Sequence, residues 1–97
     1  MNDLWVLFRD DDEAYQKWLK RNPKGYVLNA NKSPASDVVI LHRSSCRIIN
    51  GVPAKGHNWT HDWIKVCSPS KTILKGWSVR QAHREAKECE VCDPGTL

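Results

Sequence analysis

The chain has 97 residues, of which 40% are hydrophobic and 27% charged, a composition typical of one folded domain. No apolar run approaches the roughly 20 residues that a membrane-spanning helix needs, and the first residues lack the basic and apolar regions of a signal peptide. We therefore expect a single cytoplasmic domain over residues 1–97 that does not act on membranes. An enzyme with separate cofactor and substrate domains is excluded by size.

The net charge of +4 is unevenly distributed along the chain. Residues 1–22 hold four basic and five acidic residues, a net −1, and residues 88–97 hold three acidic and no basic residues, a net −3. Residues 23–87 hold eleven basic and three acidic residues, a net +8. Such a middle segment suits an anionic partner, nucleic acid above all, although an ordinary solvated surface rich in lysine would give the same count.

The first predicted elements form an N-terminal extension over residues 1–22. Residues 4–8 predict a short strand or an apolar tether. The acidic run 10–13 predicts the start of a helix, because carboxylates stabilise the positive end of the helix dipole and an aspartate can cap it. Pro23 disfavours helical geometry in Asn22, where this helix should end.

The middle of the chain predicts a small antiparallel sheet. Residues 25–30 and 37–42 read as a hairpin around the turn-forming link 31–36, and residues 63–67 alternate as a half-buried third strand would. Residues 50–58, rich in Gly and Pro, predict an exposed loop.

A helical segment is predicted to follow. Ser68 should cap a helix with Pro69 at its first position, Gly76 should end that helix, and Ser78 should start a second one through a capping box. The predicted fold is therefore α+β: a three-stranded antiparallel sheet with an N-terminal helix and a C-terminal helical segment, stapled by zinc.

The cysteines motivate that zinc. In a reducing cytoplasm a disulfide framework is disfavoured. Cys89 and Cys92 form a CxxC knuckle, whose spacing lets two thiolates bind one tetrahedral ion. The knuckle is followed by an Asp-Pro-Gly sequence, which favours a metal knuckle over a redox motif at the start of a helix.

His42 and Cys46, separated by three residues where the second predicted strand leaves the sheet, would supply the other two ligands. The resulting Cys₃His set is closed, so its Zn²⁺ would be structural and not catalytic. It would join the hairpin to the chain end across the 42 residues between Cys46 and Cys89. Three thiolates on a divalent ion leave a charge of −1, which the sequence neighbours Arg43, Arg47 and Lys87 could offset.

Two alternatives stay open. Cys67 ends a predicted strand, where a free cysteine is commonly a small buried hydrophobe, but it could replace His42 as the fourth ligand. The four thiols could also be reduced and bind no metal. His83, on the last predicted helix, could ligate but is favoured as a surface group.

The segments 26–29, 39–47 and 89–94 together resemble the small Ada-type metal-binding domain, which is the N-terminal zinc module of methylphosphotriester-repair proteins and an appendage of bacterial nucleases. The resemblance covers roughly residues 25–94. It implies His42 and Cys46 as the first ligand pair, Cys89 and Cys92 as the second, and no ligand role for Cys67.

The chain departs from that family in three places. The first ligand, which is the methyl-accepting cysteine in the repair proteins, is His42 here, so the resemblance does not carry over methyl transfer. The interval between Cys46 and Cys89 is longer than in compact members, with residues 50–60 as the insertion. Asp93 stands where a basic residue is usual, which weakens phosphate contact there.

These observations predict a non-enzymatic, zinc-stabilised module that binds nucleic acid, DNA rather than RNA, through a basic face. No catalytic centre is expected: adjacent residues on a strand point to opposite faces, so His61 and Asp62 could not easily share a site unless they lay in a turn. The expected phosphate contacts are Arg43, Arg47, Lys55, Lys65, Lys71, Lys75, Arg80 and Arg84. An alternative is a protein-interaction or regulatory subunit of a larger nuclease or defence enzyme, and a third hypothesis is methyl or thiol chemistry at Cys46 or Cys67.

Overall fold

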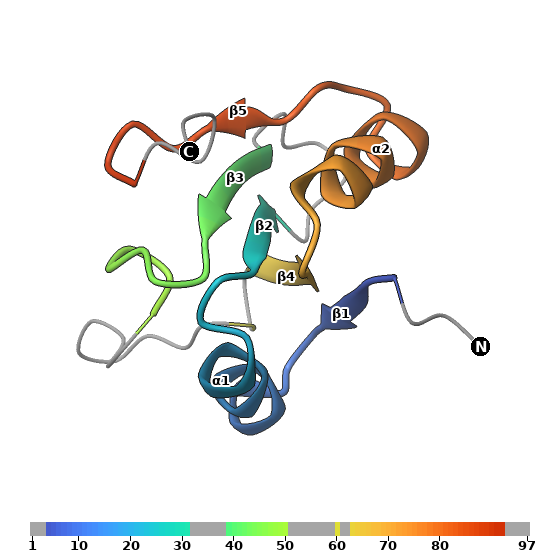
Figure 1. The fold of residues 1–97 in the computed structure, drawn as a ribbon. Coiled ribbons are helices and arrows are strands. Elements are labelled where there is room, and N and C mark those ends of the chain that lie inside the picture. The colour runs from blue at the N-terminus through green and yellow to red at the C-terminus, as the bar shows by residue number, and fades with distance from the viewer. Residues whose placement is uncertain (1–3, 32–38, 51–59, 61–62, 93–97) are drawn as a thin grey trace.

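A five-stranded mixed sheet forms the centre of the protein, with one helix on each of its faces (Figure 1). The computed structural model describes residues 4–31, 39–50, 60 and 63–92. In sheet order the strands are β1 (Val6–Phe8), β4 (Trp63–Ser68), β2 (Tyr26–Asn31), β3 (Val39–Arg43) and β5 (Lys87–Glu88). The helices are α1 (Asp12–Arg21) and α2 (Lys71–Gln81).

The predicted α+β class is confirmed, but the predicted sheet of three antiparallel strands is too small. β2 pairs antiparallel with both β3 and β4, as the hairpin and third strand require. β1 extends the sheet beyond β4 in the antiparallel sense, and β5 pairs with β3 in parallel. Two or three residues carry little strand signal in a sequence, which is why β5 could not be predicted. The predicted link 31–36 and loop 50–58 lie almost wholly outside the described residues.

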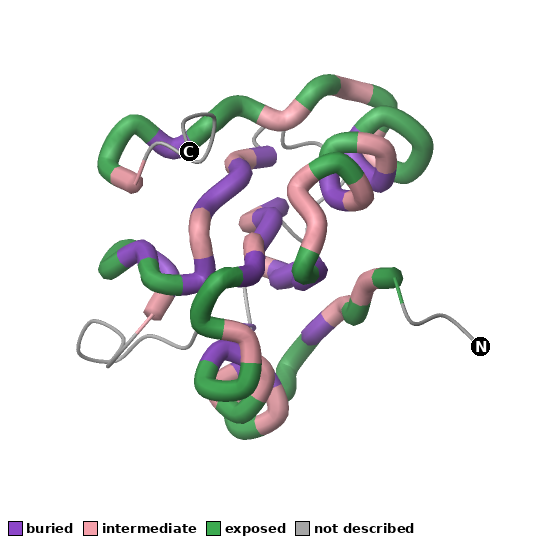
Figure 2. Tube along the Cα trace, in the orientation of Figure 1, coloured by how far each residue is buried: buried purple, intermediate pink, exposed green. Residues whose placement is uncertain are grey.

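Alternation along the strands divides the core into two layers. On β2, Val27 points toward α1 and Leu28 toward α2, because successive strand residues face opposite sides. We call these sides the α1 face and the α2 face. Buried residues accordingly follow the central strands and the sheet-facing sides of both helices (Figure 2).

Helix α1 has the predicted boundaries. The Asp11 carboxylate accepts a hydrogen bond from the Ala14 N–H at 3.2 Å, and acidic residues occupy the first turn. The helix ends at Asn22, whose N–H group bonds the Trp18 and Leu19 carbonyls. Tyr15 and Leu19 are buried against the sheet. The acidic run therefore begins a helix, as its position in the sequence predicted.

Helix α2 corrects two predictions. Ser70 is the cap, because its hydroxyl accepts from the Ile73 N–H, while the Ser68 hydroxyl accepts from the Ser70 N–H at 3.0 Å. Gly76 does not end the helix, and no second helix begins at Ser78. An interior glycine costs roughly 1 kcal/mol, which burial of Leu74 and Trp77 against the sheet can outweigh.

The end of α2 is set by His83, which adopts a left-handed backbone conformation with φ of 59°. The Ser78 hydroxyl donates to the Arg84 carbonyl at 2.6 Å and holds the chain as it turns toward β5. Within the described ranges, no helix is both long and apolar enough to cross a membrane.

Candidate metal centre

The end of β3 supplies the first pair of the predicted ligands. His42 lies opposite Val27 in the antiparallel register and therefore shares the α1 face with it. After β3 the chain turns back on itself, with the Cys46 N–H donating to the Arg43 carbonyl at 3.0 Å and the Ile49 N–H to the Cys46 carbonyl at 3.1 Å. This turn returns the Cys46 sulfur to the side of the sheet that carries the imidazole.

The parallel strand β5 supplies the second pair. Its pairing continues beyond the strand through a hydrogen bond from the Cys89 N–H to the Leu41 carbonyl at 2.9 Å. Three residues later, Cys92 Sγ accepts from the Arg43 N–H at 3.2 Å, and the Cys92 carbonyl accepts from Arg43 Nε at 3.0 Å. Arg43 thus holds the knuckle against the end of β3 at two points.

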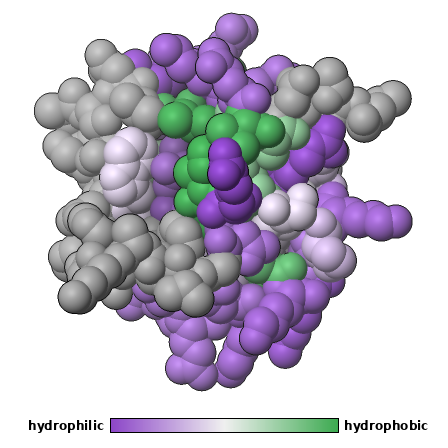
Figure 3. Space-filling model, turned by 90° about the vertical axis from the view of Figure 1, so that its left-hand side faces the viewer, coloured by the Kyte–Doolittle hydropathy of each residue, from purple (hydrophilic) through white to green (hydrophobic). Residues whose placement is uncertain are grey.

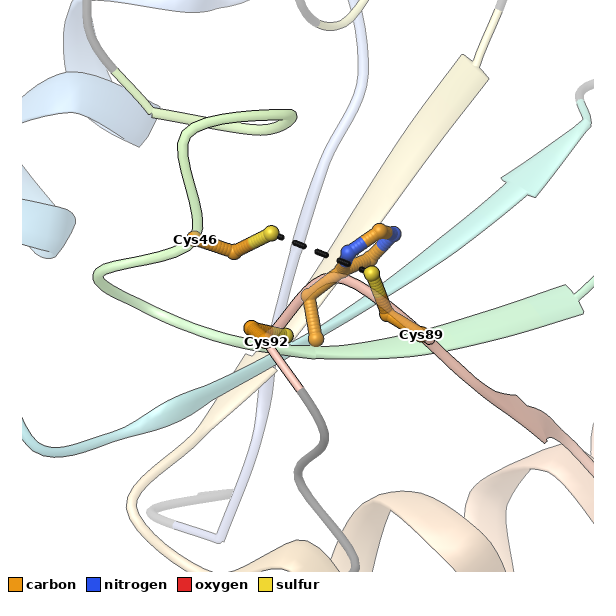
Figure 4. Close-up of side chains that lie close together, drawn as sticks. Cys46, Cys89 and Cys92 are labelled. Carbon is orange, nitrogen blue, oxygen red and sulfur yellow. Dashed lines mark hydrogen bonds between the residues drawn. The ribbon is translucent and has the colours of Figure 1, made fainter.

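The four potential ligand atoms of His42, Cys46, Cys89 and Cys92 all lie within 4.8 Å of one another. The labelled cysteines in Figure 4 converge on a common point from the turn after β3 and the segment after β5. The Cys46 and Cys89 sulfurs are 3.9 Å apart, whereas a disulfide bond measures about 2.05 Å. Metal–sulfur bonds of about 2.3 Å in a tetrahedron imply a sulfur–sulfur spacing of ~3.8 Å. The geometry fits a tetrahedral ion.

The imidazole of His42 also fits a ligand. Its side chain is 2% exposed, and neither ring nitrogen has a hydrogen-bond partner among the described residues. Buried polar atoms are rarely left unpaired, and a metal bond would satisfy one nitrogen. Burial, with a further contribution from the Lys65 charge, lowers the pKa of His42 to about 4. The ring is therefore neutral at pH 7, which is the form that binds metals.

The thiols need a cation if they are to ionise together. Burial, together with the neighbouring Cys46 and Cys89 and against the effect of the Arg43 N–H, raises the pKa of Cys92 to about 12. Burial also opposes ionisation of Cys89, but hydrogen bonds from the backbone of Cys92 and Val91 outweigh it and lower that pKa. Ionisation of one thiol in the group thus makes ionisation of the next less favourable. A bound divalent ion would offset this repulsion between thiolates and displace their protons.

The two other candidate ligands, Cys67 and His83, lie elsewhere. Cys67 is fully buried on β4, opposite Val27, and belongs to the core under α1. It is not one of the four grouped side chains. Burial raises the pKa of the Cys67 thiol. His83 is exposed at the end of α2, in agreement with the surface interpretation.

The basic residues predicted to contact phosphate have different surroundings. Arg47, Lys75 and Arg80 are exposed, and Arg43, Lys71 and Arg84 are half-buried. Lys65 is only 3% exposed and lies on the α1 face, with Nζ 6.0 Å from the centre of the Tyr15 ring. A buried ammonium cannot reach a phosphate backbone, so Lys65 is not part of a basic surface. Lys55 lies outside the described residues.

Two features of the candidate metal centre were not predicted from the sequence. The first is the double contact of Arg43 with Cys92, for which adjacency to His42 was the only signal. The second is Lys65, whose charge acts on His42 from the same face of the sheet, with β2 between their strands. Alternation within residues 63–67 could have placed Lys65 on the same side as Cys67, but its position relative to His42 depends on strand order.

The fold and the centre together define a small α+β domain in which a Cys₃His cluster, one that could hold a metal ion, joins β3 to the segment after β5. No protein-family model, curated protein or solved structure matches the chain. The resemblance to the Ada-type domain stays a prediction.

Proposed function

We propose that this protein is a non-enzymatic module, stabilised by a structural Zn²⁺ ion, that binds nucleic acid, DNA in preference to RNA. The observation that carries the proposal is the convergence of one imidazole and three thiols within 4.8 Å. This donor set suits zinc, which takes nitrogen and sulfur ligands in a tetrahedron. Four protein ligands leave no position for water or substrate, so the ion would support the fold and not catalyse a reaction.

The distribution of charge supports the nucleic-acid part of the proposal. Helix α2 and the turn after it lie on the other face of the sheet from α1, whose first turn is acidic (Figure 1). They carry four basic residues: Lys71, Lys75, Arg80 and Arg84. Arg47 adds an exposed cation beside the metal centre. Lys75 pairs with Glu88 at 3.1 Å, so a phosphate would have to compete with that carboxylate. The Ada-type resemblance, with its repair proteins and nucleases, points the same way.

The proposed zinc site is tested by measuring the metal content of the protein and by native mass spectrometry. We expect one zinc per wild-type chain and none in Cys92→Ser, which removes a ligand and the acceptor of the Arg43 N–H. Cys67→Ala is the matched control, because it also removes a buried thiol but leaves the four ligands intact. Loss of metal from Cys67→Ala with retention in Cys92→Ser would refute the assigned ligand set.

The proposed binding of nucleic acid is tested by titrating the protein into labelled DNA at several salt concentrations. Phosphate contacts release counterions, so the logarithm of the affinity should fall linearly with the logarithm of the salt concentration. Arg80→Gln and Arg47→Gln should weaken binding and flatten this dependence, whereas Lys17→Gln, on the acidic N-terminal helix, should change it little. DNA binding that is absent, or independent of salt, would contradict the proposal.

An interaction with a protein partner is the second candidate, because apolar side chains are exposed beside the metal centre. Ile48 is 46% and Val91 50% exposed, one on the turn with Cys46 and the other inside the knuckle. Figure 3 shows an apolar area bordered by hydrophilic atoms on the side of the molecule that holds these segments. Exposed apolar patches commonly mark interaction sites. Failure of DNA binding in an intact, zinc-loaded protein would favour this candidate.

A further inference from the structure

A cleft of about 310 Å³ opens where β2 begins and β3 ends. Its lining residues belong to the segment that leads into β2 and to the end of β3 with the turn after it: Pro23, Lys24, Gly25, Tyr26, Arg43 and Ser45. None of the roles discussed above uses this cleft, although Arg43 belongs to it and also holds Cys92. A volume of this size lies at the lower end of the range for small-ligand sites, roughly 300–1,000 Å³.

The side chains of the cleft combine two cations, a hydroxyl and an aromatic ring. Exposed Lys24, before β2, and Arg43, at the end of β3, both line the cleft, and exposed Ser45 adds a hydroxyl that can donate or accept. Tyr26 and Arg43 are direct partners in the antiparallel register, so their side chains lie on the same face as neighbours. Such a set suits an oxyanion that carries an aromatic group.

The backbone around Gly25 holds these side chains in place. The Gly25 N–H donates to the Asn22 carbonyl at 3.0 Å, and the Gly25 carbonyl accepts from the Ser44 N–H at 2.9 Å. A Cβ atom at this position would lie 2.8 Å from the Trp18 ring and 3.2 Å from the Ser68 carbonyl. Only glycine lets the start of β2 pack this closely against α1 and β4, and the cleft is therefore built on a fixed strand end.

We propose that this cleft binds one nucleotide of a single-stranded nucleic acid, with the phosphate between Lys24 and Arg43 and the base against Tyr26. The inference rests on the proposed nucleic-acid function and specifies its ligand. Single-strand binders combine cations that contact the backbone with aromatic rings on which unpaired bases stack. A base paired in a duplex does not expose its face, so the cleft selects an unpaired nucleotide.

Arg43 connects this cleft to the metal centre. The Nε–H of its guanidinium donates to the Cys92 carbonyl at 3.0 Å. A phosphate bound in the cleft would therefore contact a side chain that also positions the knuckle. Because Arg43 serves both sites, it is unsuited to testing either one alone.

The test uses the full chain loaded with zinc and compares a short oligothymidylate with its duplex. We expect tighter binding of the single strand, and a severalfold loss in Lys24→Gln with a salt dependence flatter by about 0.7, the contribution of one phosphate on single strands. Lys17→Gln removes the same charge from an exposed position on α1 and is the matched control. Equal losses in both variants would overturn the proposed cleft while leaving nucleic-acid binding in place.

A pair of variants at Tyr26 separates stacking from hydrogen bonding. Tyr26→Phe keeps the ring and should bind the oligothymidylate as the wild type does. Tyr26→Leu loses the ring and should bind at least about fivefold more weakly, since stacking contributes about 1–3 kcal/mol per base. Circular dichroism and zinc content show whether each variant is folded. Equal affinity of these two variants would refute the stacking role.

Amide chemical shifts provide a readout that does not depend on substitution. On titration with thymidine monophosphate, we expect the largest shifts at Gly25, Tyr26 and Ser45, and weaker ones with thymidine, which lacks the phosphate. Shifts centred on α2 instead would place the ligand elsewhere and refute the cleft. No interaction with the nucleotide, the single strand or the duplex would refute the proposed function itself.

Discussion

The two faces of the sheet are stabilised differently. The α2 face is an apolar core in which Leu28, Leu41 and Val66 pack beneath Leu74 and Trp77. The α1 face places His42, Lys65 and three cysteines near Tyr15 and Val27. Apart from the buried indole N–H of Trp77, the α2 face buries apolar surface that needs no partner, whereas the α1 face also buries an imidazole, an ammonium and thiols, which do.

This difference indicates what a metal bound by the Cys₃His cluster would do for the fold. Burying a polar group without a partner costs roughly 1–3 kcal/mol judged from mutations in proteins, and neither ring nitrogen of buried His42 has a partner among the described residues. A tetrahedral ion would bind one of these nitrogens and the three nearby sulfurs together. The α1 face therefore combines apolar side chains with a cluster that could hold a metal ion, and the α2 face is built around apolar side chains.

Removing the metal is the largest expected perturbation. Structural zinc contributes roughly 10–16 kcal/mol to the folding of zinc-finger peptides, whereas a whole domain has a stability of about 5–15 kcal/mol. We expect a strong chelator to unfold the protein at room temperature, as followed by far-ultraviolet circular dichroism and tryptophan fluorescence. Added zinc should restore both signals. An unchanged melting temperature after proven metal loss would show that the apolar core of the α2 face is enough to keep the protein folded without metal.

Truncation on the α2 face should have a smaller effect and leave the metal in place. Leu74 is fully buried in α2, and Leu→Ala in a core costs about 2–5 kcal/mol. Urea denaturation of Leu74→Ala should show this loss, and native mass spectrometry should still find one zinc. Val79→Ala, at an exposed position on the same helix, is the control and should stay within about 0.5 kcal/mol. Loss of zinc from Leu74→Ala would mean that the two faces are not independent.

The buried Lys65 should make stability depend on pH. Burial lowers the pKa of Lys65 to about 8 from an ordinary value of 10.5, against the opposing charges of Cys67 and Asp12. Below pH 8 both states carry the proton. Between pH 8 and 10.5 only the unfolded chain retains it, so this group stabilises the fold as pH rises, by up to about 1.4 kcal/mol per pH unit.

The measurement is the difference between wild type and Lys65→Met in urea denaturation from pH 7 to 10.5. The difference is needed because burial raises the pKa values of Cys67 and Tyr15, which gives the opposite slope at high pH. The wild type should gain stability relative to the variant across this range. Lys17→Met, at an exposed site, should show no such trend. A constant difference for Lys65→Met would mean that the amine keeps its ordinary pKa.

The cap of α2 provides the smallest effect. Ser70→Ala removes the hydroxyl that accepts from the Ile73 N–H and should cost about 1 kcal/mol. Ser70→Asp keeps an acceptor at the cap and should restore most of that stability. Neither variant should alter zinc content, which native mass spectrometry can check alongside thermal denaturation. A loss in Ser68→Ala without one in Ser70→Ala would return the cap to the position predicted from sequence.

Elements with strong local signals were predicted well, and those set by packing were not. The acidic run and Pro23 delimit α1 because capping and steric exclusion act within a few residues. Gly76 gave a strong local signal that proved wrong, because burial of α2 against the sheet outweighs the propensity of one residue. β5 has almost no local signal and forms because the turn after α2 delivers it to the free edge of β3.

The amino-acid sequence by itself determined the ligand types, the CxxC spacing and the strands β2, β3 and β4, because these depend on side-chain chemistry and on alternation over a few residues. Only the tertiary structure decided that β5 runs parallel to β3, that His42 and Lys65 share a face, and that Lys24 and Arg43 line one cleft. Those arrangements depend on strand order and on contacts between residues far apart in the chain, which short-range patterns do not encode.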